Sequence, residues 1–176
     1  MISLRTKDEV TASASARLLA RADSPRALAA MSEAVISRLI YPAGFYRTKA
    51  RHLRQTARLL VERHGSRVPA AMEELLALPG VGRKTANLVR NLGFGLPGIC
   101  VDTHVHRISN RLGWVRTRTP LESERALEAA LPRRYWIPVN GLLVAFGQRV
   151  CTPQSPRCSA CPIRRHCARV GVTRSR

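Results

Sequence analysis

Apolar residues recur at intervals of three and four positions along most of the chain, and this is the pattern of amphipathic helices. The clearest example is predicted over residues 47–64, where Ala50, Leu53, Ala57 and Leu60 form one apolar face. Basic residues fill much of the rest of this segment, namely Arg47, Lys49, Arg51, Arg54 and Arg58. A run of charge on a helix is usually solvated, so we expect these side chains to face water.

Capping residues mark where other helices begin. Ser24 and Ser32 are expected N-caps, and Thr119 followed by Pro120 and Glu122 fits a capping box with proline at the first helical position. Apolar spacing predicts further helices over residues 11–22, around 72–76, over 83–94, from 102 onward, and over 136–146.

Sustained alternation of apolar and polar residues, the pattern of strands, is absent from the sequence. The predicted fold is therefore all-α. We expect two helical lobes, residues 1–97 and residues 98–176.

A glycine turn separates two of these helices. Pro79 fixes its own φ, and Gly80 and Gly82 flank Val81, so a sharp hairpin is predicted over residues 78–84. Backbone N–H groups at the start of the following helix can hold a phosphate, aided by the helix dipole. Gly80, Val81, Gly82 and Arg83 are therefore candidate phosphate contacts.

The net charge indicates the kind of partner. The chain of 176 residues carries 30 Lys and Arg against 11 Asp and Glu, a formal net charge of +19, and such a surplus favours a nucleic acid. No long apolar run suggests a membrane segment. The first ten residues are too polar for a secretory signal, so a cytoplasmic location is expected.

Lysine is rare among these basic residues, since only Lys7, Lys49 and Lys84 occur. A lysine kept beside the glycine turn indicates chemistry, because an amine can lose its proton and attack whereas a guanidinium cannot. For Lys84 we expect partial burial, which would favour the neutral amine. Asp102 is expected at or near an N-cap. Taken singly, Lys84 is also explained as a solvated residue and Asp102 as a cap.

Four cysteines near the C-terminus follow the spacing C-x6-C-x2-C-x5-C, namely Cys151, Cys158, Cys161 and Cys167. Four gathered thiolates can hold a metal centre, and the spacing leaves both zinc and iron–sulfur open. His166 is a further candidate ligand, and Cys100 is expected to be a small buried side chain. Arg157, Arg164 and Arg165 lie in this loop and could reach phosphates.

The segment LPGVGRKTAN followed by VDTH, together with the cysteine loop, resembles the endonuclease III family of DNA base-excision glycosylases over nearly the whole chain. The resemblance implies a helix-hairpin-helix glycosylase fold, with Lys84 as nucleophile and Asp102 assisting it. Asp102 would either take a proton from the lysine or stabilise positive charge that develops on the sugar. It implies a [4Fe–4S] cluster on the four cysteines of loop 151–167. The implied activity is removal of damaged pyrimidines, chiefly oxidised ones, from duplex DNA, with an associated abasic-site lyase. A monomer is expected.

The resemblance also identifies residues that would fill the gap left by a flipped base. Phe45, in the turn Gly44-Phe45-Tyr46, is expected to act as an apolar wedge. Arg5 stands where many relatives carry glutamine, and its guanidinium could donate hydrogen bonds there. Relatives carry one or two further helices before the segment that opens this chain, so a shortened start is expected.

Two alternatives remain open from the sequence. A sister branch that removes mispaired thymine or uracil shares the hairpin and the cysteine loop. In the noncatalytic alternative, the hairpin is a DNA-binding module and the four cysteines hold structural zinc.

Overall fold

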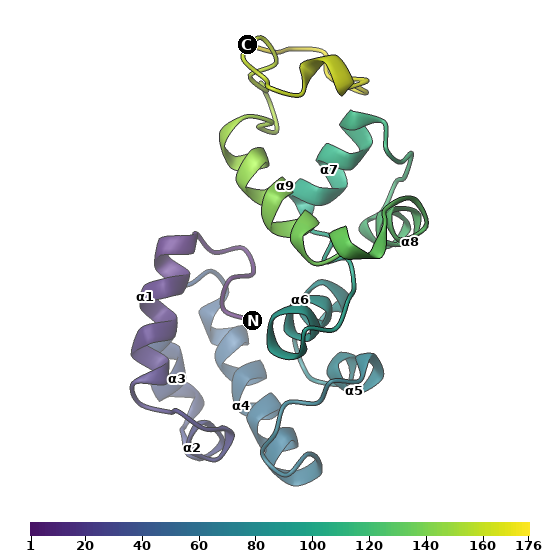
Figure 1. Cartoon of the computed structure of the whole chain (residues 1–176). Helices are drawn as coiled ribbons and strands as arrows, with labels where there is room; N and C mark the ends of the chain where they lie inside the picture. Colours follow the sequence, from purple (N-terminus) through teal and green to yellow (C-terminus); the bar gives the residue numbers. More distant parts are fainter. The chain divides into compact units, whose positions relative to one another are not determined.

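The computed structural model describes all 176 residues, and they form nine α-helices and two 3-10 turns without a strand (Figure 1). The all-α prediction is therefore confirmed. The elements are α1 (Asp8–Leu19), α2 (Pro25–Ala30), α3 (Glu33–Ile40), α4 (Tyr46–Arg63), α5 (Met72–Leu76), α6 (Arg83–Phe94), α7 (Thr103–Leu112), α8 (Pro120–Ala130), η1 (Arg133–Tyr135), α9 (Pro138–Arg149) and η2 (Arg164–His166).

The chain packs as two compact units, Met1–Ala86 and Asn87–Arg176. The change from one unit to the next falls inside α6. The division into lobes 1–97 and 98–176 stays a prediction. No helix of the protein is long and apolar enough to cross a membrane.

In the first unit, α4 packs against α2 and α3, and α3 also packs against α1. Ile36 and Ile40 of α3, with Ala50 of α4, are fully buried in the core of this unit. The predicted caps are confirmed, because the Oγ of Ser24 accepts from Ala27 N–H and the Oγ of Ser32 accepts from Val35 N–H.

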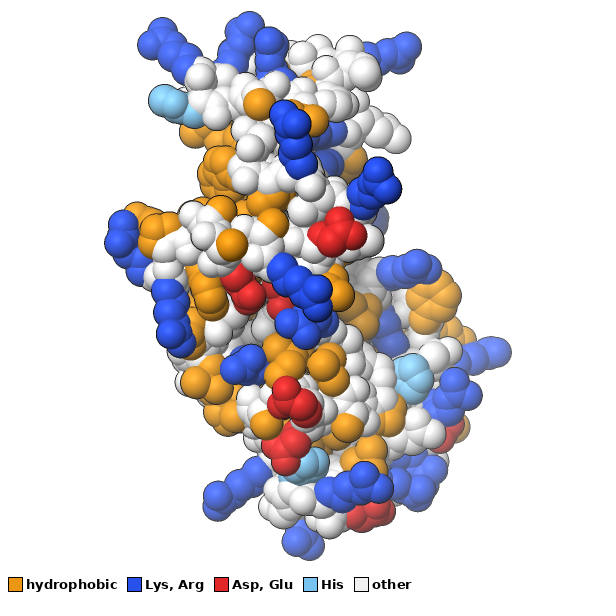
Figure 2. Space-filling view, turned by 90° about the vertical axis from the view of Figure 1, so that its right-hand side faces the viewer, with side chains coloured by type: hydrophobic (Ala, Val, Ile, Leu, Met, Phe, Trp, Pro, Cys, Tyr) orange, Lys and Arg blue, Asp and Glu red, His pale blue; other side chains and the backbone are white.

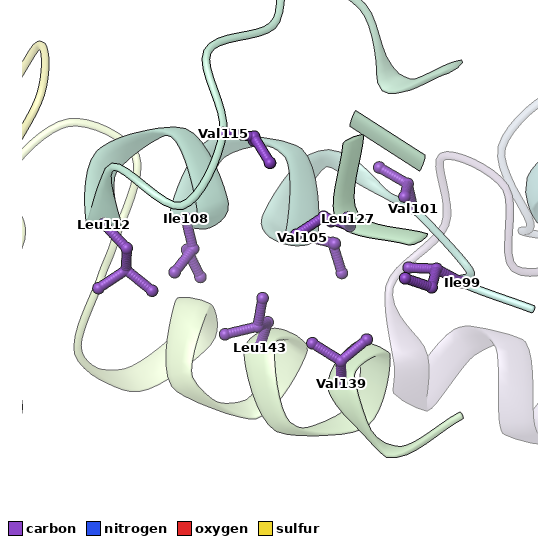
Figure 3. Packing of buried hydrophobic residues seen from close by; sticks show 9 residues of the cluster. All are labelled: Ile99, Val101, Val105, Ile108, Leu112, Val115, Leu127, Val139 and Leu143. Atoms are coloured by element: carbon purple, nitrogen blue, oxygen red, sulfur yellow. The ribbon is translucent and has the colours of Figure 1, made fainter. Parts of the chain in front are cut away.

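The core of the second unit lies mainly between α7 and α9 (Figure 3). Val139 and Leu143 of α9 point toward Val105 and Ile108 of α7, and all four are buried. Truncation of a buried leucine such as Leu143 to alanine typically costs about 2–5 kcal/mol. This core fixes the helix that begins directly after Asp102.

The bounds of two predicted helices were wrong. The first helix begins at Asp8 rather than at residue 11, because acidic residues stabilise its first turn, and it ends at Leu19 rather than at residue 22. Trp136 precedes α9 instead of belonging to it, since Pro138 starts the helix, and its Nε1–H donates to Leu131 O at 2.9 Å. The bounds of α6 are as predicted, and Gly95 follows its last residue with φ +64°.

Candidate active site and metal centre

The glycine turn between α5 and α6 is held on α4. Gly80 has φ +75°, a conformation that side chains other than glycine rarely adopt. A Cβ at Gly80 would also lie 2.7 Å from Nδ1 of His52, so the turn approaches α4 closely. Thr56 of α4 reinforces the contact, because its Oγ1 donates to Pro79 O at 3.0 Å. The local fold therefore fixes the start of α6.

Lys84 occupies the first turn of α6, as predicted, but its side chain is exposed, so the expected partial burial was wrong. The buried face of this turn is occupied by Ala86 instead. One backbone donor that we expected to face outward is used inside the hairpin, since Val81 N–H bonds to Leu78 O at 3.1 Å. Gly82 and Arg83 are exposed at the same helix start.

Asp102 is the N-cap of α7, as the sequence predicted. Its Oδ1 accepts hydrogen bonds from the N–H groups of His104 at 2.8 Å and Val105 at 2.9 Å. The residue is half-buried, in the second unit, whereas Lys84 belongs to the first. A carboxylate held by two backbone donors at a helix N-terminus is oriented by the fold.

The histidines that follow Asp102, His104 and His106, make contacts within the second unit. His106 Nδ1 lies 2.6 Å from Ser123 Oγ, and His104 Nδ1 lies 3.1 Å from Nη2 of Arg107. A Cβ on Gly147 of α9 would collide with His104 Nδ1, so α7 and α9 meet closely at this point.

Arg5 and Phe45, both expected near a flipped base, are in contact with each other. The Arg5 guanidinium carbon lies 5.5 Å from the centroid of the Phe45 ring, a cation–π distance. Both have positive φ, +50° and +57°, and Phe45 is 63% exposed. A Cβ on Gly44 would lie 2.5 Å from Arg5 O, so the turn before α4 packs tightly on the N-terminal segment.

Lys49 anchors that N-terminal segment, which is a role the sequence did not predict. It is 7% exposed, and its Nζ donates to Ile2 O at 2.6 Å, to Leu4 O and to Thr6 Oγ1. Burial lowers the pKa of Lys49 below its usual value. The expectation of a solvated side chain was wrong for Lys49, because it lies beside buried Ala50 on the inner face of α4.

The four cysteines of the C-terminal loop line one cavity, and none forms a disulfide. No three His, Cys, Asp or Glu side chains converge closely enough to hold a single metal ion. The thiols instead surround a cavity whose walls include Leu112, Phe146, Val150 and Ile163. His166 does not line it. Four thiol donors in an apolar enclosure are a donor set that fits an iron–sulfur cluster.

Two arginines of α7 connect this helix to the first cysteine of the loop. Arg107 Nη2 donates to Cys151 O at 2.9 Å, and Arg111 Nη1 donates to Cys151 Sγ at 3.4 Å and to Thr152 O at 2.7 Å. Burial, and then the nearby charge of Arg111, lowers the pKa of Arg107. Backbone bonds from Ala168 N–H to Leu112 O and from Val170 N–H to Arg111 O hold the other end of the loop.

Basic side chains are spread over the face of the protein in Figure 2, with few acidic ones among them. The loop arginines that we expected to contact phosphates, Arg157, Arg164 and Arg165, are all exposed.

Comparison with known proteins agrees with this description. Residues 1–133 match the family described as HhH-GPD superfamily base excision DNA repair protein, and residues 151–167 match the iron-sulfur binding domain of endonuclease III. Endonuclease III of Thermotoga maritima is 52% identical over 95% of this chain and 78% of its own length. The endonuclease III-like protein 1 of Bos taurus is 48% identical over 95% of this chain, which spans 56% of the bovine protein.

A solved structure of a trapped endonuclease III–DNA covalent intermediate has the same fold. It superimposes with a TM-score of 0.90 at 36% identity and covers 96% of this chain and 79% of its own. The hairpin, the capped aspartate and the cysteine loop thus define a base excision repair enzyme with an iron–sulfur centre. The chain belongs to the endonuclease III family, whose members are DNA glycosylases with an abasic-site lyase, and it carries the [4Fe–4S] cluster of that family.

Proposed function

We propose that this chain removes damaged pyrimidines, chiefly oxidised ones, from duplex DNA and then cleaves the strand at the abasic site. One observation carries the proposal: Lys84 stands in the first turn of a helix fixed by the Gly80 turn, in a chain with the fold of an enzyme trapped covalently on DNA. An exposed amine at a helix start can reach a substrate without any rearrangement of the core.

Lys84 is the proposed nucleophile. Its neutral Nζ forms a bond to C1′ of the flipped nucleotide while the bond from C1′ to the base breaks, and the base leaves with that electron pair. The bond from C1′ to O4′ then breaks, O4′ keeps the electron pair and takes a proton, and a protonated Schiff base is left between Nζ and C1′. Loss of the C2′ proton follows, and the bond from C3′ to its phosphate oxygen breaks, which cuts the strand on the 3′ side.

Asp102 is the proposed proton acceptor for the attacking amine. Its two backbone hydrogen bonds use Oδ1, which orients the carboxylate. General acid–base help of this kind contributes about 10²–10⁴ in rate.

DNA binding is proposed for two regions and the Arg5–Phe45 pair. Gly80, Gly82 and Arg83 would contact phosphates at the start of α6, whereas the N–H of Val81 is already bonded to Leu78 O. Arg157, Arg164 and Arg165 would contact phosphates from the cluster loop, and they are exposed there. Phe45, with Arg5 packed on its ring, would enter the gap left by the flipped base. Support comes from a relative solved in a non-covalent complex with DNA at a TM-score of 0.90.

Cys151, Cys158, Cys161 and Cys167 are the proposed ligands of the [4Fe–4S] cluster. When bound, the cluster would crosslink the loop through these four side chains. The loop would then hold Arg157, Arg164 and Arg165 in position to contact DNA. We also propose that the protein acts as a monomer in the cytoplasm, at the nucleoid.

The test is single-turnover excision on a panel of duplexes, each with one lesion: an oxidised pyrimidine, a mispaired thymine or a mispaired uracil. Products are analysed with and without alkali, which separates base release from strand cleavage. We expect the fastest release from oxidised pyrimidines, with alkali-independent cleavage. Preferred release of mispaired thymine or uracil would contradict the proposed specificity for oxidised pyrimidines and indicate a mismatch glycosylase. DNA binding without any base release would indicate a noncatalytic hairpin module.

A further inference from the structure

The segment of residues 98–101 leads directly into Asp102, belongs to no helix or strand, and is almost wholly enclosed. Ile99 and Cys100 are fully buried, and Val101 is 5% exposed. A buried segment outside helices and sheets has no regular backbone partners for its carbonyl groups, so these groups must find other donors.

Three asparagine side chains supply those donors, one for each of three consecutive carbonyls. Asn91 Nδ2 donates to Gly98 O at 3.0 Å, and Asn87 Nδ2 donates to Ile99 O at 3.2 Å. Asn140 Nδ2 donates to Cys100 O at 2.8 Å. The first two asparagines come from α6 and the third from α9, so two helices hold the segment.

The backbone at Gly98 also lies close against Asn87, and α8 contributes a further contact to the same side chain. A Cβ on Gly98 would lie 2.7 Å from Oδ1 of Asn87, so the segment rests directly on the amide. Asn87 Nδ2 is shared with Oε1 of Glu124 of α8 at 3.1 Å, and both residues are buried. The Asn87 amide therefore has little freedom to move.

We propose that Asn87, Asn91 and Asn140 act as positioning residues that fix Asp102 for base excision. The inference rests on the proposed role of Asp102. The N-cap bonds orient the carboxylate relative to α7 alone, whereas the three asparagines fix the peptide planes just before it relative to α6 and α9. Misplacement of a reacting group by about 1 Å can cost about 10²-fold in rate.

The test uses Asn140→Leu, because Asn140 is half-buried and the change is nearly isosteric. We expect single-turnover excision to fall roughly 10- to 100-fold. Affinity for a duplex with a tetrahydrofuran abasic analogue should stay within about twofold, because the three asparagines are not proposed to contact DNA. Asn110→Leu is the matched control. Asn110 is also half-buried, and its Nδ2 donates to His106 O at 2.8 Å and to Thr117 Oγ1 at 2.9 Å, so these two bonds do not hold residues 98–101. The Asn110→Leu variant should be less stable than the wild type, but its excision rate should fall much less than that of Asn140→Leu.

A double mutant separates positioning from general destabilisation. If the asparagines act through Asp102, Asn140→Leu should slow excision little further in an Asp102→Asn background. The proposal would be overturned if Asn140→Leu lowered the excision rate by the same factor in the wild-type and Asp102→Asn backgrounds. Wild-type excision by a folded Asn140→Leu protein would also overturn it. If Asn140→Leu does not fold, Gly98→Ala displaces the same segment and is measured in the same way.

The two proposals fail differently. Slow excision by Asp102→Asn with normal excision by Asn140→Leu overturns only the positioning role. Wild-type excision by Asp102→Asn overturns the catalytic role of Asp102 and the positioning role with it.

Discussion

Asp102 accepts a hydrogen bond from Val105 N–H at 2.9 Å, so the proposed proton acceptor is also the residue that starts α7. Val105 itself is fully buried in the core between α7 and α9. The cap thus ties the carboxylate to the buried core of its unit, and the negative charge lies at the favourable end of the helix dipole.

Asp102→Asn separates the cap from the charge. Asparagine caps helices about as well as aspartate, so the free energy of unfolding should change little. The amide cannot accept the proton, and excision should slow by about 10²–10⁴. The measurement is single-turnover base release beside thermal unfolding. Wild-type release would mean that Asp102 is only a cap.

Lys49→Met should destabilise the N-terminal segment. The substitution removes the Nζ donor from the buried carbonyl of Ile2 and from the partly buried carbonyl of Leu4. An unsatisfied buried group such as Ile2 O costs about 1–3 kcal/mol. Arg51→Met, an exposed position on the same helix, is the control and should change stability by no more than about 0.5 kcal/mol. Denaturant unfolding compares the two proteins. Equal stability of both variants would contradict the anchoring role of Lys49.

Glu122 should make the stability of α8 depend on pH. A backbone hydrogen bond from Arg118, and then one from the Thr119 side chain, lower the pKa of Glu122 below its usual 4.5. The folded state therefore favours the charged carboxylate. The contribution of Glu122 to the stability of the folded protein is present above pH 4.5 and is lost as the pH falls through the lowered pKa. The difference in melting temperature between wild type and Glu122→Ala should shrink below pH 4.5. A difference that stays constant there would contradict this account.

Local signals in the sequence were enough to predict much of the fold. The caps at Ser24, Ser32 and Asp102 depend on residues within three positions, and each was found where expected. The bounds of α6 were also predicted, because the glycines that flank it and its apolar spacing act locally.

Features that depend on distant parts of the chain could not be predicted in this way. The hydrogen bonds of Lys49 reach residues 43 to 47 positions away, so its burial has no local pattern. The bond from Asn140 to Cys100 spans 40 positions. The rarity of lysine was the one signal that could have singled out Lys49. The exposure of Lys84 follows from the rotation of α6, which places Ala86 inward.

Cys158→Ser should remove the cluster and weaken DNA binding without removing the catalytic groups. Thiolates left without iron would take up protons, and the loop that carries Arg157, Arg164 and Arg165 would loosen. The salt slope of binding should fall by about one unit for every phosphate that an arginine no longer neutralises. We expect a colourless protein with a lower iron content and a shallower salt dependence.

Cys100→Ala is the matched control, since Cys100 is fully buried and does not line the cluster cavity. It should keep the brown colour and the salt slope of the wild type. Cys158→Ser protein that stays folded, keeps its affinity and salt slope, and yet fails in single-turnover excision at saturating enzyme would show that the cluster takes part in bond breaking.

The identity of the amine that bonds to DNA tests the central claim most directly. The wild-type protein is trapped with borohydride on a duplex that contains one abasic site, digested, and analysed by mass spectrometry for the residue that carries the sugar adduct. Lys7 is the internal comparison, because it is exposed like Lys84, whereas Lys49 is buried. We predict the adduct on Lys84 and none in a folded, DNA-binding Lys84→Gln variant. An adduct on Lys7, Lys49 or the amine of Met1, or undiminished trapping by Lys84→Gln, would contradict the account.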